Sequence, residues 1–498
     1  MAAGRKSGGH VTAADAVRSP TDGTIVCRTT LAGLDPGCVP INLFGNGSPS
    51  QAAINYVTGG SGGGSYSNLT TKEDVLSATV RGTPFALPAG DINFAAGIEH
   101  RRESGRSMVD SITSTPPDGT GLRNLPGIFL TGIAGGRYQN NPQPINGKYT
   151  VDEVFGEIEI PLLKDSSFAH LLSINGAIRY IDYSTVGGVT TWKLGVSYEP
   201  FAGVRVRGTR SRDIRAANIS ELYQGATQAT GSVIYQGQTR TVVGLRSGNL
   251  NLAPEKADTT TVGLVFRPEF APGFGASIDL YQIKINGAIT QLTNQQTADL
   301  CAAGASTACA QITTNTIGAL TFLTPFLNIA SSTARGIDFE VDYSSDLGSG
   351  RVTARALASY LDELSTTLPG SPSVDRAGDL GLSGTPKWSG TASLNYDVGP
   401  LGLFVQERLI GGGKVDTTFN DSILGEANDI GPILYTDLTI KFRVEGKRKL
   451  EFFATASNLL NQEPKVVPAN PLLFYRSTNP ALYDVVGRYV TVGARVAF

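Results

Sequence analysis

The sequence predicts an all-β protein whose strands form an antiparallel transmembrane β-barrel. Three observations support this fold class. Side chains alternate between apolar and polar along most of the chain, the alternating segments are long, and the connections between them are alternately short and long. Successive side chains of a strand lie on opposite faces, so a two-residue period indicates a sheet with one apolar and one polar face.

The C-terminal segment illustrates the alternation. Its apolar positions share one face, and polar or small residues occupy the other; the apolar set is Val490, Val492, Ala494, Val496 and Phe498. The segments 92–99, 192–199 and 438–445 follow the same pattern. In a soluble sandwich the polar face would meet water and the apolar face a dry core. In a transmembrane barrel the apolar face meets lipid and the polar face lines a hydrated lumen.

We predict about fifteen strands. Most are longer than the usual five or six residues of a globular strand, and they suit the roughly 9–11 tilted residues that cross a bilayer. The expected strands lie near 74–83, 91–102, 149–160, 169–183, 188–199, 202–212, 257–267, 274–290, 327–344, 350–363, 386–398, 401–411, 432–445, 448–457 and 487–498.

The connections between these strands alternate in length. Short links such as 268–273 and 399–400 follow long ones such as 213–256 and 291–326, and only 184–187 breaks the rule. Short periplasmic turns and long extracellular loops are typical of an up-and-down membrane barrel. If the last strand ends in the periplasm, residues 1–73 lie on the extracellular side.

Composition excludes several classes of protein. Charged residues are 17% and hydrophobic residues 40% of the chain, which argues against intrinsic disorder. The net charge of −2 does not indicate a nucleic-acid partner, and no apolar segment approaches the 18 residues or so of a transmembrane helix. The three histidines lack metal-ligand spacing and no G-x-S-x-G motif occurs, so we expect no enzyme activity, no metal and no cofactor.

The four cysteines form two pairs that are close in sequence: Cys27 with Cys38, and Cys301 with Cys309. Two local pairs in an otherwise cysteine-free chain suggest two disulfides formed in an oxidising compartment. The alternative is four unrelated free thiols. Both pairs fall on the extracellular side of the expected topology.

Two arginines are expected to face the lumen. Arg205 and Arg207 alternate with Val204 and Val206, so they belong to the polar face. They are either a positive wall for an anionic substrate or lumen charges neutralised by acids, for which the candidates are Asp182, Glu199 and Glu340.

Asp338, Glu340 and Asp342 alternate with apolar residues in the same way. We interpret these carboxylates as part of the hydrated lumen face opposite the arginines. Paired carboxylates can act in acid–base catalysis, but no partner histidine accompanies them.

Several aromatic residues lie near expected strand ends: Trp192, Tyr180, Tyr183, Tyr198 and Phe201. Aromatic side chains form girdles at both membrane interfaces of such barrels, and we interpret these residues in that way.

Six segments resemble, in the same order, the C-terminal barrel of TonB-dependent outer-membrane receptors. Residues 209–223 (TRSRDIRAANISELY) resemble the arginine-bearing strand end and Asn-x-Ser-Glu-Leu stretch of that family. The others are similar to further strands of the family barrel: 249–267 (NLNLAPEKADTTTVGLVFR), 278–289 (IDLYQIKINGAI), 328–343 (NIASSTARGIDFEVDY), 386–399 (PKWSGTASLNYDVG) and 453–460 (FATASNLL). The closing GRYVTVGARVAF resembles the terminal strand of the family.

The resemblance implies a complete receptor with a signal peptide, a TonB box, a plug domain and a barrel of 22 strands. No segment of this chain resembles the first three. We therefore expect residues 1–73 to be the remnant of an extracellular loop and residues 74–498 to be the C-terminal part of the barrel. Such a chain would be a fragment that does not transport alone.

The resemblance also implies a function: active transport of a scarce, large nutrient across the Gram-negative outer membrane. Siderophore, vitamin B12 and oligosaccharide receptors share these motifs, so all three substrate classes stay open. The expected partners are outer-membrane lipid, the barrel assembly machinery and, through the plug alone, the TonB complex. Phe498, with Val496 and Val492, would be the C-terminal assembly signal. A passive porin is the alternative function.

Overall fold

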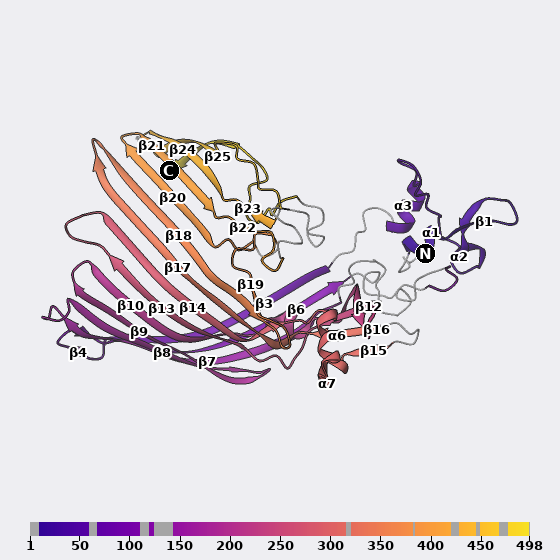
Figure 1. Ribbon diagram of the computed structural model, residues 1–498, viewed down its shortest axis with the longest axis horizontal. Helices are drawn as coiled ribbons and strands as arrows, with labels where there is room; N and C mark the ends of the chain where they lie inside the picture. The colour runs from indigo at the N-terminus through magenta and orange to yellow at the C-terminus, as the bar shows by residue number, and fades with distance from the viewer. Residues whose placement is uncertain are drawn as a thin grey trace.

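A computed structural model describes residues 9–58, 67–109, 119–123, 143–314, 320–381, 384–419, 428–444, 449–467 and 477–497. About half of these residues belong to strands of one large antiparallel sheet (Figure 1). No helix in these ranges is long and apolar enough to cross a membrane.

The large sheet contains fifteen long strands that pair in chain order, and the short β19 (Val374–Asp375) pairs with one of them. Each of the fifteen overlaps one of the strands expected from the sequence, so the predicted number is confirmed. They are β3 (Ser67–Gly82), β6 (Asn93–Val109), β7 (Asn146–Lys164), β8 (Leu171–Tyr183), β9 (Gly187–Phe201), β10 (Val204–Arg215), β13 (Glu255–Phe266), β14 (Phe274–Thr290), β17 (Leu327–Leu347), β18 (Gly350–Thr367), β20 (Trp388–Val398), β21 (Leu401–Ile410), β24 (Ile433–Val444), β25 (Lys449–Ser457) and β26 (Tyr489–Ala497).

The pairing register separates two faces of this sheet, because directly opposed residues share a face. One row of partners runs from Arg207 through Gly263, Asp279 and Asp338 to Ser359. We call the face that carries Arg207, Asp279 and Asp338 the inner face. The neighbouring row has apolar partners, Val206 with Leu264, Ile278 and Phe339, and we call the face that carries it the outer face.

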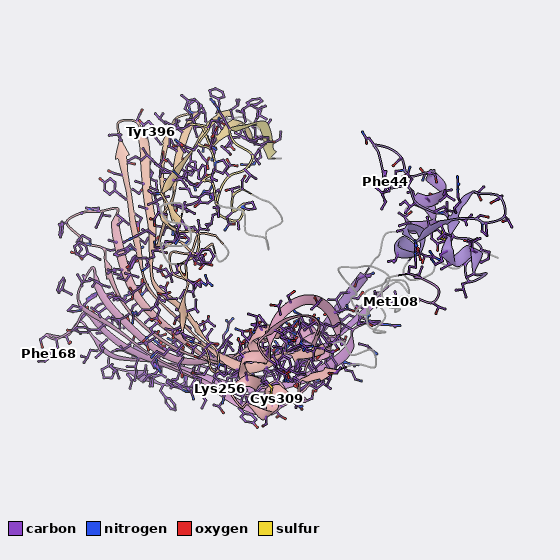
Figure 2. All side chains as sticks on the ribbon, turned by 45° about the vertical axis from the view of Figure 1, so that its right-hand side comes forward. Phe44, Met108, Phe168, Lys256, Cys309 and Tyr396 are labelled. Atoms are coloured by element: carbon purple, nitrogen blue, oxygen red, sulfur yellow. A yellow bond between two sulfur atoms is a disulfide. The ribbon has the colours of Figure 1, made fainter. Side chains whose placement is uncertain are left out.

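The sheet is curved around its inner face (Figure 2). The row that begins at Arg207 continues through Ser389 to Ile410 and Ile433. These two isoleucines are buried together with Val415, Val467 and Tyr483 from the connections that follow β21 and β25. Those connections therefore fold against the inner face, where they include β22 (Gly413–Lys414) and β23 (Asp429–Ile430).

The sheet ends at β3 on one side and at β26 on the other. In the described part of the chain, each of these two strands has one sheet neighbour, β6 and β25 respectively. All sixteen residues of β3 are exposed. The observed strand begins at Ser67, so the expected boundary at residue 74 falls within it. The turn after β3 includes β4 (Ala86–Leu87) and β5 (Gly90–Asp91).

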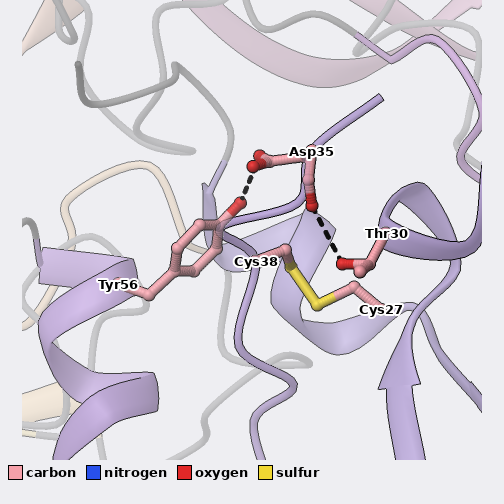
Figure 3. The surroundings of a disulfide bond; sticks show 5 residues. All are labelled: Cys27, Thr30, Asp35, Cys38 and Tyr56. Carbon is pink, nitrogen blue, oxygen red and sulfur yellow. Dashed lines mark hydrogen bonds between the residues drawn. A yellow bond between two sulfur atoms is a disulfide. The ribbon is translucent and has the colours of Figure 1, made fainter. Parts of the chain in front are cut away.

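Residues 9–58 form a small unit at the end of the sheet reached by β3 and β6 (Figure 1). It contains α1 (Gly9–Ala14), β1 (Ala16–Arg18), β2 (Ile25–Cys27), α2 (Arg28–Leu31) and α3 (Gln51–Thr58). A disulfide joins Cys27 to Cys38 (Figure 3). The Tyr56 hydroxyl donates to Asp35 Oδ2 at 2.9 Å, which ties α3 to the segment that carries Cys38.

Two long connections that the sequence predicts as loops share a second, four-stranded sheet. It consists of β11 (Thr227–Tyr235), β12 (Gln238–Ser247), β15 (Ile312–Thr314) and β16 (Leu320–Pro325). The helices α6 (Asn294–Ala302) and α7 (Ser306–Cys309) accompany it, and Ala298 of α6 is buried against Val242 and Phe322. The parallel pairing of β12 with β16 joins segments far apart in sequence, which alternation within one segment does not reveal.

Candidate functional site

The inner face carries ion pairs that cross between strands. Arg207 of β10 donates to both carboxylate oxygens of Asp279 on β14, at 3.0 and 2.7 Å. The strand between them contributes Gly263, whose missing side chain leaves the space that the two side chains use. Charge-assisted, two-point contacts of this kind orient an arginine more firmly than a single hydrogen bond does.

The other charges expected at the lumen also have partners. Arg205 pairs with Glu199, Arg355 pairs with Glu340 at 2.7 Å, and the Ser359 hydroxyl donates to Asp338 at 2.7 Å. On this face, the positive charges of Arg205 and Arg355 are therefore paired with carboxylates rather than left unopposed.

The expectation for one acid is wrong. Asp182 is the register partner of Asp152, which in turn opposes His100, and these residues share the outer face with Ile98. A side chain on the outer face cannot neutralise Arg205 or Arg207. The expected strand 169–183 does contain Asp182, but the Asp182 side chain lies on the face opposite to the one expected from the sequence. In a strand, an error of one residue in the assignment of faces moves a side chain to the opposite side.

The short helix α5 (Ile219–Tyr223) covers the inner face at the end of the sheet where the long connections lie. Asn218 accepts from the backbone N–H of Glu221, and the Glu221 carboxylate accepts from that of Asn218, which completes a capping box. Arg215 then binds both Glu221 and Glu255, at 3.0 and 2.7 Å. The Asn-x-Ser-Glu-Leu segment thus fastens a helix to two strands, a role that its resemblance to the family did not specify.

Two glycines allow α5 to approach the sheet closely. A Cβ atom added at Gly105 would overlap Ile219, and one added at Gly147 would overlap the ring of Tyr223. The helix buries Tyr183 in a cluster that also contains Tyr149, Val151 and Ile181. The expectation that Tyr183 belongs to an aromatic girdle is therefore wrong, because its side chain lies on the inner face beneath α5.

A cavity of about 630 Å³ lies between the inner face and the connection that follows β25. Arg408 and Tyr435 line it from β21 and β24, and the Arg408 guanidinium stacks 4.7 Å from the centroid of the Tyr435 ring. Among the described residues, Arg408 makes no ion pair within 4.0 Å, but the carboxylates of Asp437 and Asp484 line the same cavity. A cation and aromatic rings in one cavity can bind an aromatic ligand.

Asn458 holds the rim of this cavity together. Its backbone N–H donates to Asp437 Oδ1 at 2.7 Å, and its side-chain amide donates to Asp484 Oδ2 at 2.9 Å and to the Gln462 carbonyl at 3.0 Å. These bonds join β24 to both ends of the connection between β25 and β26. Sequence reasoning missed Arg408, Tyr435 and Asn458 as a site, although the segment FATASNLL was recognised as a motif.

A second polar network lies in the connections outside the strands. Arg376 pairs with the fully buried Asp379 and with Asp416, both at 2.7 Å. Burial by itself would raise the pKa of Asp416, but hydrogen bonds from Thr418 and the charge of Arg376 outweigh it, so its pKa is lowered. Asp416 thus remains a carboxylate that holds two connections together.

The remaining expected site residues are placed as follows. Disulfides join Cys27 to Cys38 and Cys301 to Cys309. Val492 and Val496 lie on the outer face of β26 and are exposed. Phe498 lies outside the described residues. No group of three or more histidine, cysteine, aspartate or glutamate side chains in the described ranges is arranged to hold a metal ion.

Solved structures with a similar fold include bacterial receptors for ferric enterobactin, siderophores and ferric catecholate. A mutant of the ferric enterobactin receptor PfeA from Pseudomonas aeruginosa has a TM-score of 0.59 at 15% identity and is covered over 54% of its length by 86% of this chain. The siderophore receptor PirA from Acinetobacter baumannii scores 0.57 at 14% identity, with 86% and 55% coverage. The ferric-catecholate import receptor Fiu from E. coli K12 scores 0.50 at 13% identity, with 86% and 55% coverage.

This chain therefore spans about half the length of these solved receptors. A search of curated proteins finds no match. The sequence family described as "TonB dependent receptor-like, beta-barrel" matches residues 41–459, which is most of the chain. The chain belongs to the TonB-dependent receptor-like β-barrel family.

Proposed function

We propose that this chain forms part of the barrel wall of a TonB-powered importer that carries an iron–siderophore complex across the outer membrane. The observation that carries the proposal is the cavity at Arg408 and Tyr435, which faces the lumen side of a receptor-type sheet. Barrels of this family lie in the outer membrane and are transporters rather than enzymes.

The chemistry of the cavity favours a catecholate among the siderophores. Catecholates are aromatic, and the cavity offers a tyrosine ring with an arginine stacked on it, while Asp437 and Asp484 in the same lining offset the charge of that arginine. Two of the similar structures are named as receptors for ferric enterobactin and for ferric catecholate import. In receptors of this family TonB supplies the energy through a plug domain, and we propose the same source for this importer.

Uptake of radiolabelled iron tests the proposal. The protein is expressed as a fusion to a plug domain, so that both form one receptor, in cells grown under iron limitation. These cells should take up a ferric catecholate, and a protonophore should stop the uptake. Arg408→Gln should raise the KM for uptake about tenfold, since hydrogen bonds to charged groups contribute roughly 1.5–3 kcal/mol.

The matched control is Lys193→Gln, which removes an exposed cation from the inner face at β9, away from the cavity. It should leave the KM unchanged. Uptake that persists with the protonophore, or steady ion conductance in planar bilayers, would contradict the proposal and favour a passive porin. Energised uptake of cobalamin or an oligosaccharide, without uptake of a ferric siderophore, would support an active transporter but contradict the proposed substrate class.

A further inference from the structure

The outer face changes from apolar to charged at the same level on four adjacent strands. Register partners in the last apolar row are Gly208, Val262, Leu280 and Ile337. The next row towards the long connections is Arg210, Thr260, Gln282 and Arg335. Apolar residues on this face meet lipid tails, so the change of polarity marks the edge of the hydrocarbon layer.

Five cations gather within three rows beyond this edge, and we call them the outer cationic patch: Arg210, Arg212, Lys256, Lys284 and Arg335. Two of them are neutralised by neighbouring acids. Arg212 pairs with Asp258 at 2.9 Å and Arg335 pairs with Asp362 at 2.7 Å.

The other three cations have no ion pair among the described residues. Arg210 donates to the Thr260 hydroxyl, and Lys256 and Lys284 are exposed. The patch therefore keeps a local excess of positive charge, next to a surface that is built to contact acyl chains.

Trp192 lies at the same level. It is the register partner of Arg212, and 37% of its surface is exposed on the outer face. Tryptophan at this depth is typical of the interface between headgroups and hydrocarbon. The patch thus lies where lipid headgroups are, and not in bulk solvent above the membrane.

A cavity farther along the outer face has the same character. It measures about 860 Å³ and is lined by Lys72, Arg106 and Lys148 from the same ends of β3, β6 and β7. Among the described residues, its lining contains hydroxyl and amide side chains and no carboxylate, and Tyr223 of α5 also borders it. Cations on the outer face beyond the apolar rows therefore occur on separate strands, with Asp152 on β7 and Asp182 on β8 between the two groups.

We propose that the outer cationic patch binds the phosphate group of a membrane lipid whose acyl chains lie on the apolar rows below. Arginine and lysine side chains form charge-assisted hydrogen bonds with phosphate, and each cation near an anionic membrane surface strengthens its attraction. The apolar rows and the cations would then contact the two ends of one molecule. This surface is separate from the transport cavity, and the proposal rests only on the location of the family in the outer membrane.

Fluorescence quenching of Trp192 by brominated lipid tests the proposal. Trp388 is replaced by Phe so that Trp192 is the sole tryptophan, and the protein is placed in phosphatidylcholine nanodiscs. Phosphatidic acid with brominated chains should quench at a mole fraction about five- to tenfold lower than brominated phosphatidylcholine does, given the attraction per cation at a membrane surface. Brominated diacylglycerol, which lacks the phosphate, should show no such preference, and free inorganic phosphate should compete only weakly.

The triple variant Arg210→Gln/Lys256→Gln/Lys284→Gln should lower the preference for phosphatidic acid to about one. The control variant Lys164→Gln/Arg267→Gln/Arg351→Gln removes three exposed cations at the opposite end of the strands and should keep it. Circular dichroism must show equal strand content in all forms. The proposal would be overturned if the triple variant preferred phosphatidic acid over phosphatidylcholine as strongly as the protein with only Trp388 replaced. Equal quenching by all three brominated lipids would overturn it as well.

Discussion

Arg207 and Asp279 are separated by 72 residues and by one intervening strand, yet they form a two-point ion pair across Gly263. The pair spans two strand spacings because the central strand has no side chain at that position. A glycine within a strand often marks such a close approach of neighbouring groups. On the inner face of β10, β13 and β14, the contact between Arg207 and Asp279 therefore depends on the missing side chain of Gly263.

Replacing Gly263 by alanine should break this pair. A Cβ atom there would overlap Asp279 Oδ1 and would lie 3.0 Å from Arg207 Nε. We expect a loss of about 1–3 kcal/mol in unfolding free energy, the usual cost of overpacking. Urea unfolding in lipid vesicles, followed by circular dichroism, measures it.

The control is Gly208→Ala on the neighbouring strand. The nearest atom to a Cβ there is Val196 Cγ1 at 3.7 Å, which is ordinary contact. This variant should unfold within about 0.5 kcal/mol of the wild type, as typical surface substitutions do. Equal destabilisation by both alanines would mean that strand propensity, and not the ion pair, sets the cost.

Removing the Asn458 side chain should loosen the connection between β25 and β26. Asn458 is almost fully buried and has a φ of 48°, which an alanine tolerates poorly. Asn458→Gly relieves the backbone conformation but loses the bonds to Asp484 and Gln462, so it separates the two effects.

Hydrogen exchange of the amides of residues 458–467 and 477–487 measures the loosening. Both variants should exchange faster, and Asn458→Ala fastest. Each lost hydrogen bond leaves a buried polar group without a partner, which costs about 1–3 kcal/mol. If Asn458→Gly exchanges like the wild type, the side-chain bonds do not hold this connection.

Both disulfides should be present in protein isolated under oxidising conditions. Peptide mass spectrometry without reduction should find Cys27 linked to Cys38 and Cys301 linked to Cys309. Each closes a short loop and is worth about 2–3 kcal/mol to the local fold. Reduction should make residues 9–58 and α6–α7 more sensitive to protease while the large sheet resists. Four free thiols, or links between the two pairs, would contradict this assignment.

Acid should release the connection that carries Asp416. Because the pKa of Asp416 is lowered in the folded protein, its carboxylate stabilises the fold at pH values above the unfolded pKa of about 3.9. This contribution disappears as the pH falls through the lower, folded pKa. Protease cleavage between residues 411 and 419 should therefore increase below about pH 4.

Asp416→Asn should be cleaved faster already at pH 7 and show a weaker dependence on pH. Asp429→Asn is the control, since it removes an exposed carboxylate that pairs only with Lys414 among the described residues. An unchanged pH profile in Asp416→Asn would show that another group controls the opening of this connection.

Local alternation was sufficient to identify the long strands, because the two-residue period of a strand is a property of each segment alone. It also grouped Arg205, Arg207, Asp338 and Glu340 on one face of the sheet, since each alternates with apolar neighbours. The assignment failed at Asp182 and Tyr183. Near the end of β8 the outer face becomes polar and the inner face is covered by α5, so polarity no longer distinguishes lipid from lumen.

The sequence by itself determined the fold class, the fifteen strands and most of the residues that share a face, since these depend on neighbours along the chain. Only the tertiary structure decided that Arg207 meets Asp279, that β12 pairs with β16, and that Arg408 stacks on Tyr435 beside a cavity. Those contacts depend on the register between strands and on how long connections fold back over the sheet. Both are set by packing between segments distant in sequence, and no pattern within a single segment encodes them.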